Sequence, residues 1–253
     1  MNHDRFRIGS THISITSTKT AIETIEDAAL NNKGGYVCFS NMRTVQYAGK
    51  DNSYKELMEG SLMNCADGRP LVWCGRMWGL KEEKSTPGPI VFKCIMEDGN
   101  KDLKHFLLGD TDEVLESLKI KYGEKAQIVG MYSPPFAPIE TYDYCAITAM
   151  ISASGANVVW TALTAPKQDF LSKKLSILMP DTLFVAVGRA FRIAIGTVKE
   201  APTWATRLGL AWLFNHRRPL PITIWSITKR FFVLIAYLLR ILFRRVRGIK
   251  YFE

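Results

Sequence analysis

HFLLGDTDEVLESLKIKYGEKAQIVG, residues 105–130, contains the pattern that decides the fold. An apolar run at residues 105–109 is followed by an amphipathic stretch, and a second apolar run begins at residue 126. Short apolar runs bounded by turn residues predict buried strands, whereas apolar residues spaced three and four apart predict a helix. The stretch therefore predicts a strand–helix–strand unit with parallel strands.

The same alternation recurs on both sides of this unit. It predicts a Rossmann-like α/β fold, in which a parallel sheet is flanked by helices and a C-terminal amphipathic helical appendage follows. Strands are expected within residues 35–41, 105–109, 126–132, 157–163 and 181–188, and residues 64–69 are expected to form a turn that leads into a helix. Helices are expected over residues 18–31, 42–59, 110–123, 142–155 and 166–179, and from residue 70 onwards. Residues 80–102 are rich in Gly, Pro and Lys and are expected to form a loop or a mobile flap.

Composition and charge divide the chain into two parts. The hydrophobic fraction of 47% and the charged fraction of 23% are those of an ordinary folded protein. Residues 217–253 contain nine Lys or Arg and one acid, whereas the rest of the chain is nearly neutral. A basic segment on a neutral body is typical of a surface-binding appendage rather than a nucleic-acid-binding core. We expect a catalytic core at residues 1–195 and an appendage at residues 196–253.

Cysteine usage and the terminus indicate the compartment. The five cysteines are odd in number and form no CxxC pair, as expected for reduced thiols in the cytosol. The polar N-terminus does not resemble a signal peptide, and the chain has no run of 18 uncharged apolar residues. We therefore expect neither secretion nor a conventional spanning helix.

Candidate ligand-binding residues follow the predicted strands, because ligands of open parallel sheets bind beyond the carboxyl ends of the strands. Glycines beside helix starts let backbone N–H groups approach a phosphate, although such glycines also serve turns. The pattern favours a nucleotide or sugar-phosphate site without a GxGxxG or Walker sequence. The candidates are Ser40, Asn41, Asp67, Gly68, Gly109, Gly130, Tyr132, Thr164, Pro166, Lys167, Gln168, Gly188 and Arg189.

Two acidic motifs each have two interpretations. Asp67 is either a catalytic base or a turn residue that caps the helix beginning at Pro70. Asp110-Thr111-Asp112 resembles the DxD metal motif of some sugar transferases, but capping of the following helix is the favoured interpretation. The four histidines lack ligand spacing, so no metal site and no cofactor are expected.

The C-terminal helix is amphipathic. At roughly 100° per residue, Lys229, Arg240, Arg244 and Arg247 fall within about 60° of one another. An apolar face flanked by arginines is expected of a helix that lies in a bilayer interface; docking on the core or on another subunit is the alternative. The apolar side comprises Ile227, Phe231, Leu234, Leu238, Ile241 and Leu242. Expected membrane-binding residues are Trp225, Lys229, Arg230, Phe231, Phe232, Arg240, Arg244 and Arg245.

Several motifs together resemble one family. TALTAPKQDF, residues 161–170, is similar to its "GLGxPKQE" signature, and residues 187–213 are similar to "VGxxFDxxAGxxxRAPxWxxxxGLEWL". The order and spacing of these motifs over about residues 10 to 220 resemble the WecG/TagA/CpsF glycosyltransferases, glycosyltransferase family 26. The resemblance implies a Rossmann-like core whose appendage closes over the active site and meets the membrane.

The resemblance also implies a reaction and its partners. It implies inverting, metal-independent transfer of a hexosyl or N-acetylhexosaminyl group from a UDP-sugar to a polyprenyl-pyrophosphate-linked saccharide. The expected place is the cytoplasmic face of the bacterial inner membrane, where the enzyme would be peripheral or monotopic and would serve capsule or exopolysaccharide synthesis. The general base maps to Asp67, and further site residues map to Asn41 and Gln168. Nucleic acid is not an expected partner, and a homo-oligomer is left open.

The sequence departs from the family pattern at several positions. The family's Thr two residues before Asn41 is Phe39, and its Asp after "VGxxF" is Arg192. Ala211 replaces a Glu. Whether Arg217 and Arg218 bind the pyrophosphate in place of the family's appendage arginines is left open. A non-catalytic membrane-associated scaffold is the alternative function, and a nucleotide-dependent reductase is a third hypothesis that lacks the glycine fingerprint.

Overall fold

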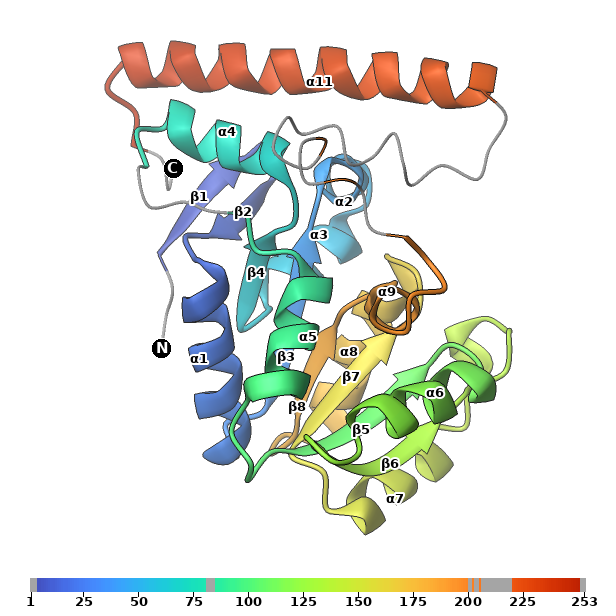
Figure 1. Ribbon diagram of the computed structural model, residues 1–253. Helices are drawn as coiled ribbons and strands as arrows, with labels where there is room; N and C mark the ends of the chain where they lie inside the picture. The colour runs from blue at the N-terminus through green and yellow to red at the C-terminus, as the bar shows by residue number, and fades with distance from the viewer. Residues whose placement is uncertain (1–3, 81–84, 200–201, 203–204, 206–219, 251–253) are drawn as a thin grey trace.

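A six-stranded parallel sheet forms the centre of the molecule (Figure 1). The computed structural model describes residues 4–80, 85–199, 202, 205 and 220–250. The strand order is β4-β3-β8-β7-β5-β6, and every neighbouring pair is parallel. The predicted α/β class is therefore confirmed. The strands are β3 (Gly35–Ser40), β4 (Met63–Ala66), β5 (Lys104–Gly109), β6 (Gln127–Tyr132), β7 (Val158–Ala162) and β8 (Leu183–Ala186).

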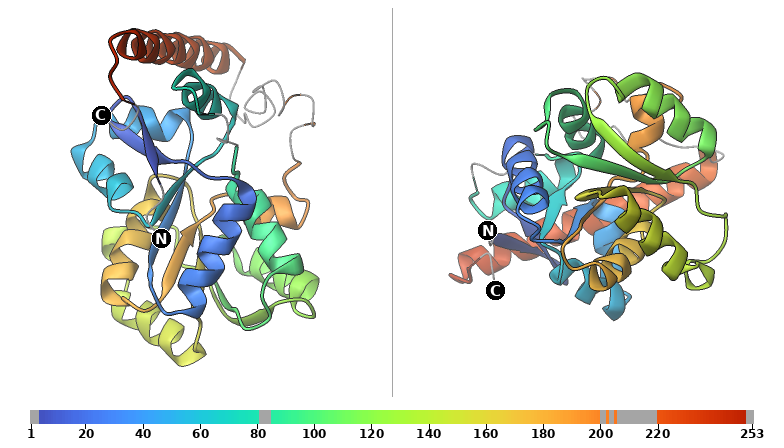
Figure 2. Two further views of the ribbon diagram at one scale, coloured as in Figure 1. Left: turned by 90° about the vertical axis from the view of Figure 1, so that its left-hand side faces the viewer. Right: turned by 90° about the horizontal axis from the view of Figure 1, so that it is seen from below.

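Helices cover both faces of this sheet (Figure 2). Successive strand side chains point to opposite faces, so Val37 and Phe39 join one apolar cluster while Tyr36 and Cys38 join the other. The first cluster contains helices α1 (Thr18–Leu30), α5 (Gly88–Asp98), α6 (Asp112–Tyr122) and α9 (Ala190–Ala194). The second contains α3 (Asn52–Glu59), α7 (Tyr144–Ser154), α8 (Lys167–Leu178) and the end of α2 (Met42–Ala48), with the short helix η1 (Ile139–Thr141) beside it.

A third apolar cluster lies at the β4 end of the sheet. It joins a hairpin, β1 (Arg5–Ile8) and β2 (Thr11–Ser14), to α4 (Arg69–Met77) and to the C-terminal helix α11 (Leu220–Val246). Asn64 of β4 connects the hairpin to the sheet: its backbone N–H donates to the Ser14 hydroxyl, and its Nδ2 donates to the His12 carbonyl oxygen. The hairpin was not predicted from the sequence.

Two predicted segments differ from the structure. The helix expected over residues 42–59 is two helices, because Gly49 ends α2 and the Asp51 side chain caps α3 by accepting from the Tyr54 N–H. The loop expected over residues 80–102 is wrong for its greater part, since α5 begins at Gly88. Proline suits the first turn of a helix, where its missing N–H costs nothing, so a Pro-rich stretch can start one. Residues 81–84 lie outside the described chain.

Helix α11 lies across α4 at the outer edge of the molecule (Figure 1). Leu234 and Ile241 are buried in the third cluster, and Val233, Tyr237 and Leu238 pack against it. The apolar face predicted from the sequence is thus partly wrong, because it includes side chains that dock on the core. Seven other apolar side chains are exposed and fall within an arc of about 120° at roughly 100° per residue. They are Phe231, Phe232, Ile235, Leu239, Leu242, Phe243 and Val246.

Among the described residues, no helix is long and apolar enough to cross a membrane. At roughly 100° per residue, Arg240 and Arg247 lie between the exposed arc and the side of α11 that docks on the core, and Arg244 lies at the edge of the docked side. The Arg245 guanidinium donates to the Met77 carbonyl oxygen at 3.1 Å. The helix therefore presents one apolar face to the core and another to its surroundings, with a basic stripe along one boundary.

Candidate active site

Asp67 lies just beyond the carboxyl end of β4. Its backbone N–H donates to the Ser40 carbonyl oxygen at 2.6 Å, which fixes it beside the end of β3. Gly68 follows with φ of 114°, a conformation that favours glycine, and its N–H donates to the Ser85 hydroxyl at 3.1 Å. Gly68 is the N-cap of α4, and no side chain caps that helix. The interpretation of Asp67 as a helix cap is therefore wrong, and its carboxylate is not used by α4.

Asp67 is half-buried, and the partial loss of solvent around its carboxyl group changes the acidity of that group. Desolvation raises the pKa of Asp67 to about 6, and the positive charge of Arg189 opposes this rise. Arg189 is exposed and follows β8, two strands away from β4. An aspartate with a pKa near 6 is mostly ionised at pH 7 yet is a stronger proton acceptor than an ordinary aspartate. This electrostatic setting suits a general base.

Gln168 and Gly188 lie together beside the end of β8. The Gln168 Nε2 donates to the Ala186 carbonyl oxygen at 3.3 Å, whereas its buried Oε1 has no hydrogen-bond partner among the described residues. A Cβ placed on Gly188 would lie 3.5 Å from that Oε1. A buried acceptor without a partner is costly, so this carboxamide is prepared for a donor from a ligand or from water.

The sequence interpretation missed Asp169, the neighbour of Gln168. Its side chain is buried and accepts a hydrogen bond from the Tyr54 hydroxyl at 2.7 Å. Burial raises the pKa of Asp169 to about 7, although the Tyr54 hydrogen bond lowers it. The sequence feature that could have revealed it is an acid on the buried face of a helix. Leu171 and Ser172, which lie near it on α8, are buried too. Asp169 holds α8 to α3 rather than facing the open edge of the sheet.

The Asn41 and Ser40 side chains have partners within the protein. The Asn41 Oδ1 accepts from the N–H groups of Arg43 and Thr44 and so caps α2. The Ser40 hydroxyl is buried and donates to the Asn64 Oδ1 at 2.7 Å. It points to the sheet face opposite that of Phe39. Asn41 keeps only its Nδ2 group for a ligand, and Ser40 contributes to the site through its backbone carbonyl.

Phe39, at the position where the resemblance implies a threonine, packs in the first apolar cluster together with Cys65 of β4. Its ring packs against the start of α5, where a Cβ on Gly88 would lie 3.2 Å from ring carbons. Phe39 is paired in register with Cys65 of β4 and is almost completely buried. The position therefore carries an apolar ring in place of the hydroxyl group that the family resemblance implies.

The predicted residues on β5 and β6 lie farther from Asp67. Strand β6 is separated from β4 by five strand spacings, about 24 Å at about 4.8 Å each. Gly130 is inside β6 rather than at its end, and it is glycine because a Cβ would lie 2.5 Å from the Phe106 ring. A Cβ on Gly109 would lie 2.7 Å from the Ala162 carbonyl oxygen. Tyr132 is the last residue of β6 and is half-buried.

Asp110 forms an ion pair rather than a helix cap. Arg192 donates to both Asp110 carboxylate oxygens, with Nε at 3.0 and 2.9 Å and Nη2 at 2.8 Å from Oδ1. Thr111 is the N-cap residue of α6, although its side chain makes no capping bond, and Asp112 and Glu113 are in the first turn. Asp112 thus complements the dipole of α6, whereas Asp110 connects the end of β5 to α9 through its ion pair with Arg192.

The β7–α8 turn adds a cationic side chain. The Lys167 ammonium group lies over the Tyr142 ring, 5.0 Å from its centroid, and donates to the Ala137 carbonyl oxygen. Thr164 is exposed in the same turn, and Pro166 is the N-cap of α8. Arg43, which the sequence interpretation did not include, reaches the Ala165 carbonyl oxygen at 3.5 Å. The turn therefore lies between α2 and the β6–α7 loop.

Some predicted residues cannot be placed. Arg217 and Arg218 lie outside the described residues, as do the side chains of Trp225, Lys229 and Arg230. The remaining membrane-binding candidates on α11 are described, and Phe231, Phe232, Arg240 and Arg245 are exposed while Arg244 is half-buried.

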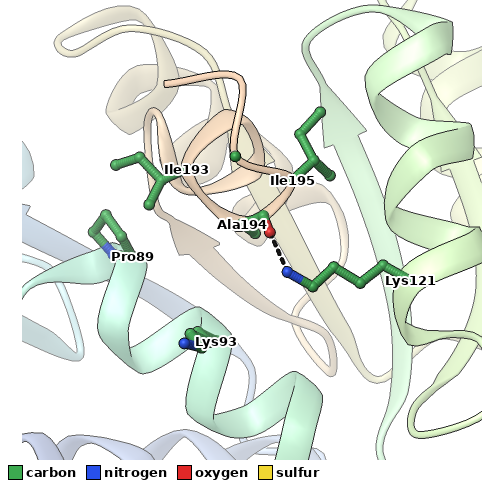
Figure 3. Close-up of a pocket in the computed structure, with 7 residues that line it drawn as sticks. Pro89, Lys93, Lys121, Ile193, Ala194 and Ile195 are labelled. Carbon is green, nitrogen blue, oxygen red and sulfur yellow. Dashed lines mark hydrogen bonds between the residues drawn. The ribbon is translucent and has the colours of Figure 1, made fainter. Parts of the chain in front are cut away.

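A cavity of about 320 Å³ lies between α5, α6 and α9 (Figure 3). Lys93 and Lys121 line it, and the Lys121 ammonium group donates to the Ala194 carbonyl oxygen at the end of α9. None of the predicted site residues lines this cavity. Within the described part of the chain, no group of three or more His, Cys, Asp or Glu side chains could hold a metal ion.

One protein family matches nearly the whole chain. Residues 6–250 match the Glycosyl transferase WecG/TagA/CpsF family, which covers nearly the whole chain, including α11. The match includes both the sheet edge that carries Asp67, Gln168 and Gly188 and the helices that follow it. The chain therefore belongs to the WecG/TagA/CpsF family and is a glycosyltransferase.

Proposed function

We propose that this glycosyltransferase moves a hexosyl or N-acetylhexosaminyl group from a UDP-sugar to a polyprenyl-pyrophosphate-linked saccharide during bacterial surface polysaccharide synthesis. The reaction inverts the anomeric centre and uses Asp67 as its general base. The observation that carries the proposal is the Asp67 carboxyl group, held beyond β4, unused by α4, and raised in pKa to about 6 by burial.

The transfer is a single displacement. As the acceptor hydroxyl oxygen attacks the anomeric carbon, Asp67 takes its proton, and the bond from that carbon to the nucleotide diphosphate breaks. The negative charge that develops on the leaving diphosphate requires donors at the same edge. Arg189 lies close enough to affect the pKa of Asp67, and the chain around Gly188 can approach a ligand closely. The proposed reaction needs no metal ion, as the family resemblance implies.

The donor and acceptor are proposed to approach from different sides. Gln168 and Gly188 lie near the centre of the carboxyl edge, whereas Asp67 lies at its β4 end, beneath the part of the molecule that includes α4 and α11. A lipid-linked acceptor stays near the bilayer surface, so it should enter at the α11 side. Residues 196–253 are accordingly proposed as an appendage that contacts the cytoplasmic face of the inner membrane and closes over the site.

The exposed face of α11 supports membrane contact. Its seven exposed apolar side chains, from Phe231 to Val246, form one continuous arc beside arginines. Such a face gains free energy when it enters the headgroup and acyl boundary, and the arginines are attracted to anionic lipids. Peripheral or monotopic attachment is therefore proposed.

Incubation of bacterial membranes with the protein and a panel of radiolabelled nucleotide sugars tests this function. Extraction of the lipids should recover label from one UDP-sugar, and only when both the protein and the membranes are present. Recovery of label from no nucleotide sugar would contradict the proposal.

A non-catalytic scaffold is the second candidate, favoured by Phe39 at the family's threonine position. It predicts that the protein binds membranes but transfers no sugar and hydrolyses no nucleotide sugar. A thermal-shift panel of nucleotides also distinguishes the transferase from the third hypothesis, a reductase. UDP should raise the unfolding temperature of a transferase, whereas NAD or NADP would raise that of a reductase.

A further inference from the structure

A second cavity, of about 370 Å³, lies between the β1–β2 turn and the C-terminal half of α11. Trp78, the C-cap of α4, forms part of its wall, whereas Asp67 precedes the first residue of α4. Nine helical residues at about 1.5 Å each place the two ends of α4 about 14 Å apart. The cavity is therefore separate from the Asp67 site.

The cavity is strongly cationic. Arg7, Arg240 and Arg244 line it, and none of its lining residues is acidic. Among the described residues, the ion pairs include neither Arg240 nor Arg244. Arg240 and Arg244 face the same concave space, where their like charges repel each other, so an anion between them would stabilise the arrangement.

Neighbouring contacts fix the walls of this cavity. The Arg7 Nε donates to the Gly9 carbonyl oxygen at 3.0 Å, and the Trp78 indole N–H donates to the Arg7 carbonyl oxygen at 3.0 Å. Tyr237 packs so closely on the turn that a Cβ on Gly9 would lie 2.9 Å from its ring and hydroxyl. The cavity is thus formed by packed elements and does not depend on a chance approach of surface side chains.

The cavity also contains a hydroxyl group that the protein leaves unused. The Ser10 Oγ is buried and has no hydrogen-bond partner among the described residues. Ser10 and Gly49, the C-cap of α2, both line the cavity, and a Cβ on Gly49 would lie 3.6 Å from the Ser10 Oγ. A buried hydroxyl without a partner is uncommon because its desolvation costs free energy. A bound oxyanion would satisfy it.

We propose that this cavity binds a phosphate-bearing group. Guanidinium groups bind the oxygens of phosphates through paired charge-assisted hydrogen bonds, and the Ser10 hydroxyl adds a neutral donor. Arg240 also lies on α11 between the exposed apolar arc and the docked side, so the bound group would lie near the edge of that exposed surface. An anionic phospholipid headgroup and a soluble phosphate ester share this chemistry. The inference stands whether or not the sugar-transfer proposal holds.

Two variants of α11 provide a matched test. Arg244→Gln and Arg247→Gln each remove one positive charge from the same basic stripe, but only Arg244 lines the cavity. The full-length protein is titrated with sn-glycerol 3-phosphate by calorimetry, and separately with phosphatidylcholine vesicles with and without phosphatidylglycerol. Circular dichroism verifies that each variant is folded.

The cavity predicts an unequal response. Arg244→Gln should weaken binding about tenfold or more, since a hydrogen bond to a charged group is lost. Arg247→Gln should weaken vesicle binding about fivefold or less, through surface charge alone. If sn-glycerol 3-phosphate binds saturably and Arg244→Gln weakens this binding more than Arg247→Gln does, a soluble phosphate ester is enough to occupy the cavity. If only the vesicles that contain phosphatidylglycerol bind, and Arg244→Gln again has the larger effect, the occupant is a lipid headgroup.

A third variant tests the cavity without a change of charge. Ser10→Ala should weaken binding by a few fold, because it removes the neutral donor and leaves every arginine in place. Equal losses for Arg244→Gln and Arg247→Gln with no effect of Ser10→Ala would overturn the proposal, as would the absence of binding to both probes.

Discussion

The backbone N–H of Asp67 donates to the Ser40 carbonyl oxygen at 2.6 Å, and this bond joins the ends of β3 and β4 just where the candidate base leaves the sheet. The Asp67 main chain is therefore held at the ends of two neighbouring strands.

Sugar transfer should depend on pH through the Asp67 carboxyl group. Below a pKa of about 6 the carboxyl is protonated and cannot accept a proton, so kcat/KM should rise with pH and level off above pH 7. Arg189→Gln removes the charge that lowers this pKa, so the rise should shift to higher pH, whereas Arg189→Lys should leave it nearer the wild-type position. A profile that Arg189→Gln leaves unmoved would contradict the coupling of the two side chains.

The buried Asp169 carboxyl group should make the protein less stable at high pH. Its pKa is raised to about 7 in the folded state, so between pH 4 and pH 7 the native state binds more protons than the unfolded state. The free energy of unfolding should therefore fall as pH rises through this window, by on the order of 2–4 kcal/mol from this group. Asp169→Asn should remove that part of the fall.

Urea denaturation gives the free energy of unfolding of the variant and of the wild type at pH 5 and at pH 8. The effect is the amount by which the difference between the two proteins changes from one pH to the other. Asp112→Asn, at an exposed acid in the first turn of α6, is the matched control and should keep the wild-type pH dependence. If Asp169→Asn and the control behaved alike, Asp169 would not be the titrating group.

The Asp110–Arg192 ion pair should contribute more stability than a surface pair. The Asp110 side chain is 7% exposed and accepts three bonds from one guanidinium group, although Arg192 itself is partly solvated. Arg192→Ala leaves this carboxylate without its cation and should cost about 1–2 kcal/mol in urea unfolding. Lys19→Ala, which breaks the exposed pair with Glu23 at 3.8 Å, should cost less than about 0.5 kcal/mol. Equal costs would show that burial of Asp110 has no energetic effect.

The exposed arc of α11 should bind membranes. Leu239→Glu places a charge in the middle of this arc and should weaken binding to vesicles containing phosphatidylglycerol at least tenfold, since apolar burial is replaced by desolvation of a carboxylate. Ile120→Glu is the matched control, because Ile120 is 83% exposed on α6 and belongs to no such arc. Sedimentation with vesicles measures both, and equal losses would exclude α11 as the contact surface.

The central sheet could be predicted from the sequence because its strands and helices carry local patterns. The run at residues 105–109 and the helix stop at Gly123 are both where the apolar periodicity places them. The hairpin was missed although Phe6 and Ile8 alternate with arginines, because two strands of four residues give too short a pattern. Strand order depends on pairings between distant segments, which no local pattern specifies.

The candidate site was predicted in part for the same reason. The placement of Asp67 and Gln168 at one sheet edge follows from parallel topology together with the family resemblance. The buried state of Ser40, the packing role of Gly130 and the Asp169–Tyr54 bond depend on which elements meet across the sheet. The docking of Leu234 and Ile241 shows the same limit, because a helical wheel locates apolar positions but cannot tell which of them face the core.

The most direct measurement is the turnover of Asp67→Asn with a UDP-sugar and membrane-held acceptor. Asparagine keeps the shape of the side chain and the backbone bond to Ser40 but cannot accept the acceptor's proton, so kcat should fall about 100-fold or more. Asp112→Asn should retain wild-type turnover. Near-wild-type kcat for Asp67→Asn, with the variant shown to be folded, would contradict the assignment of Asp67 as the general base.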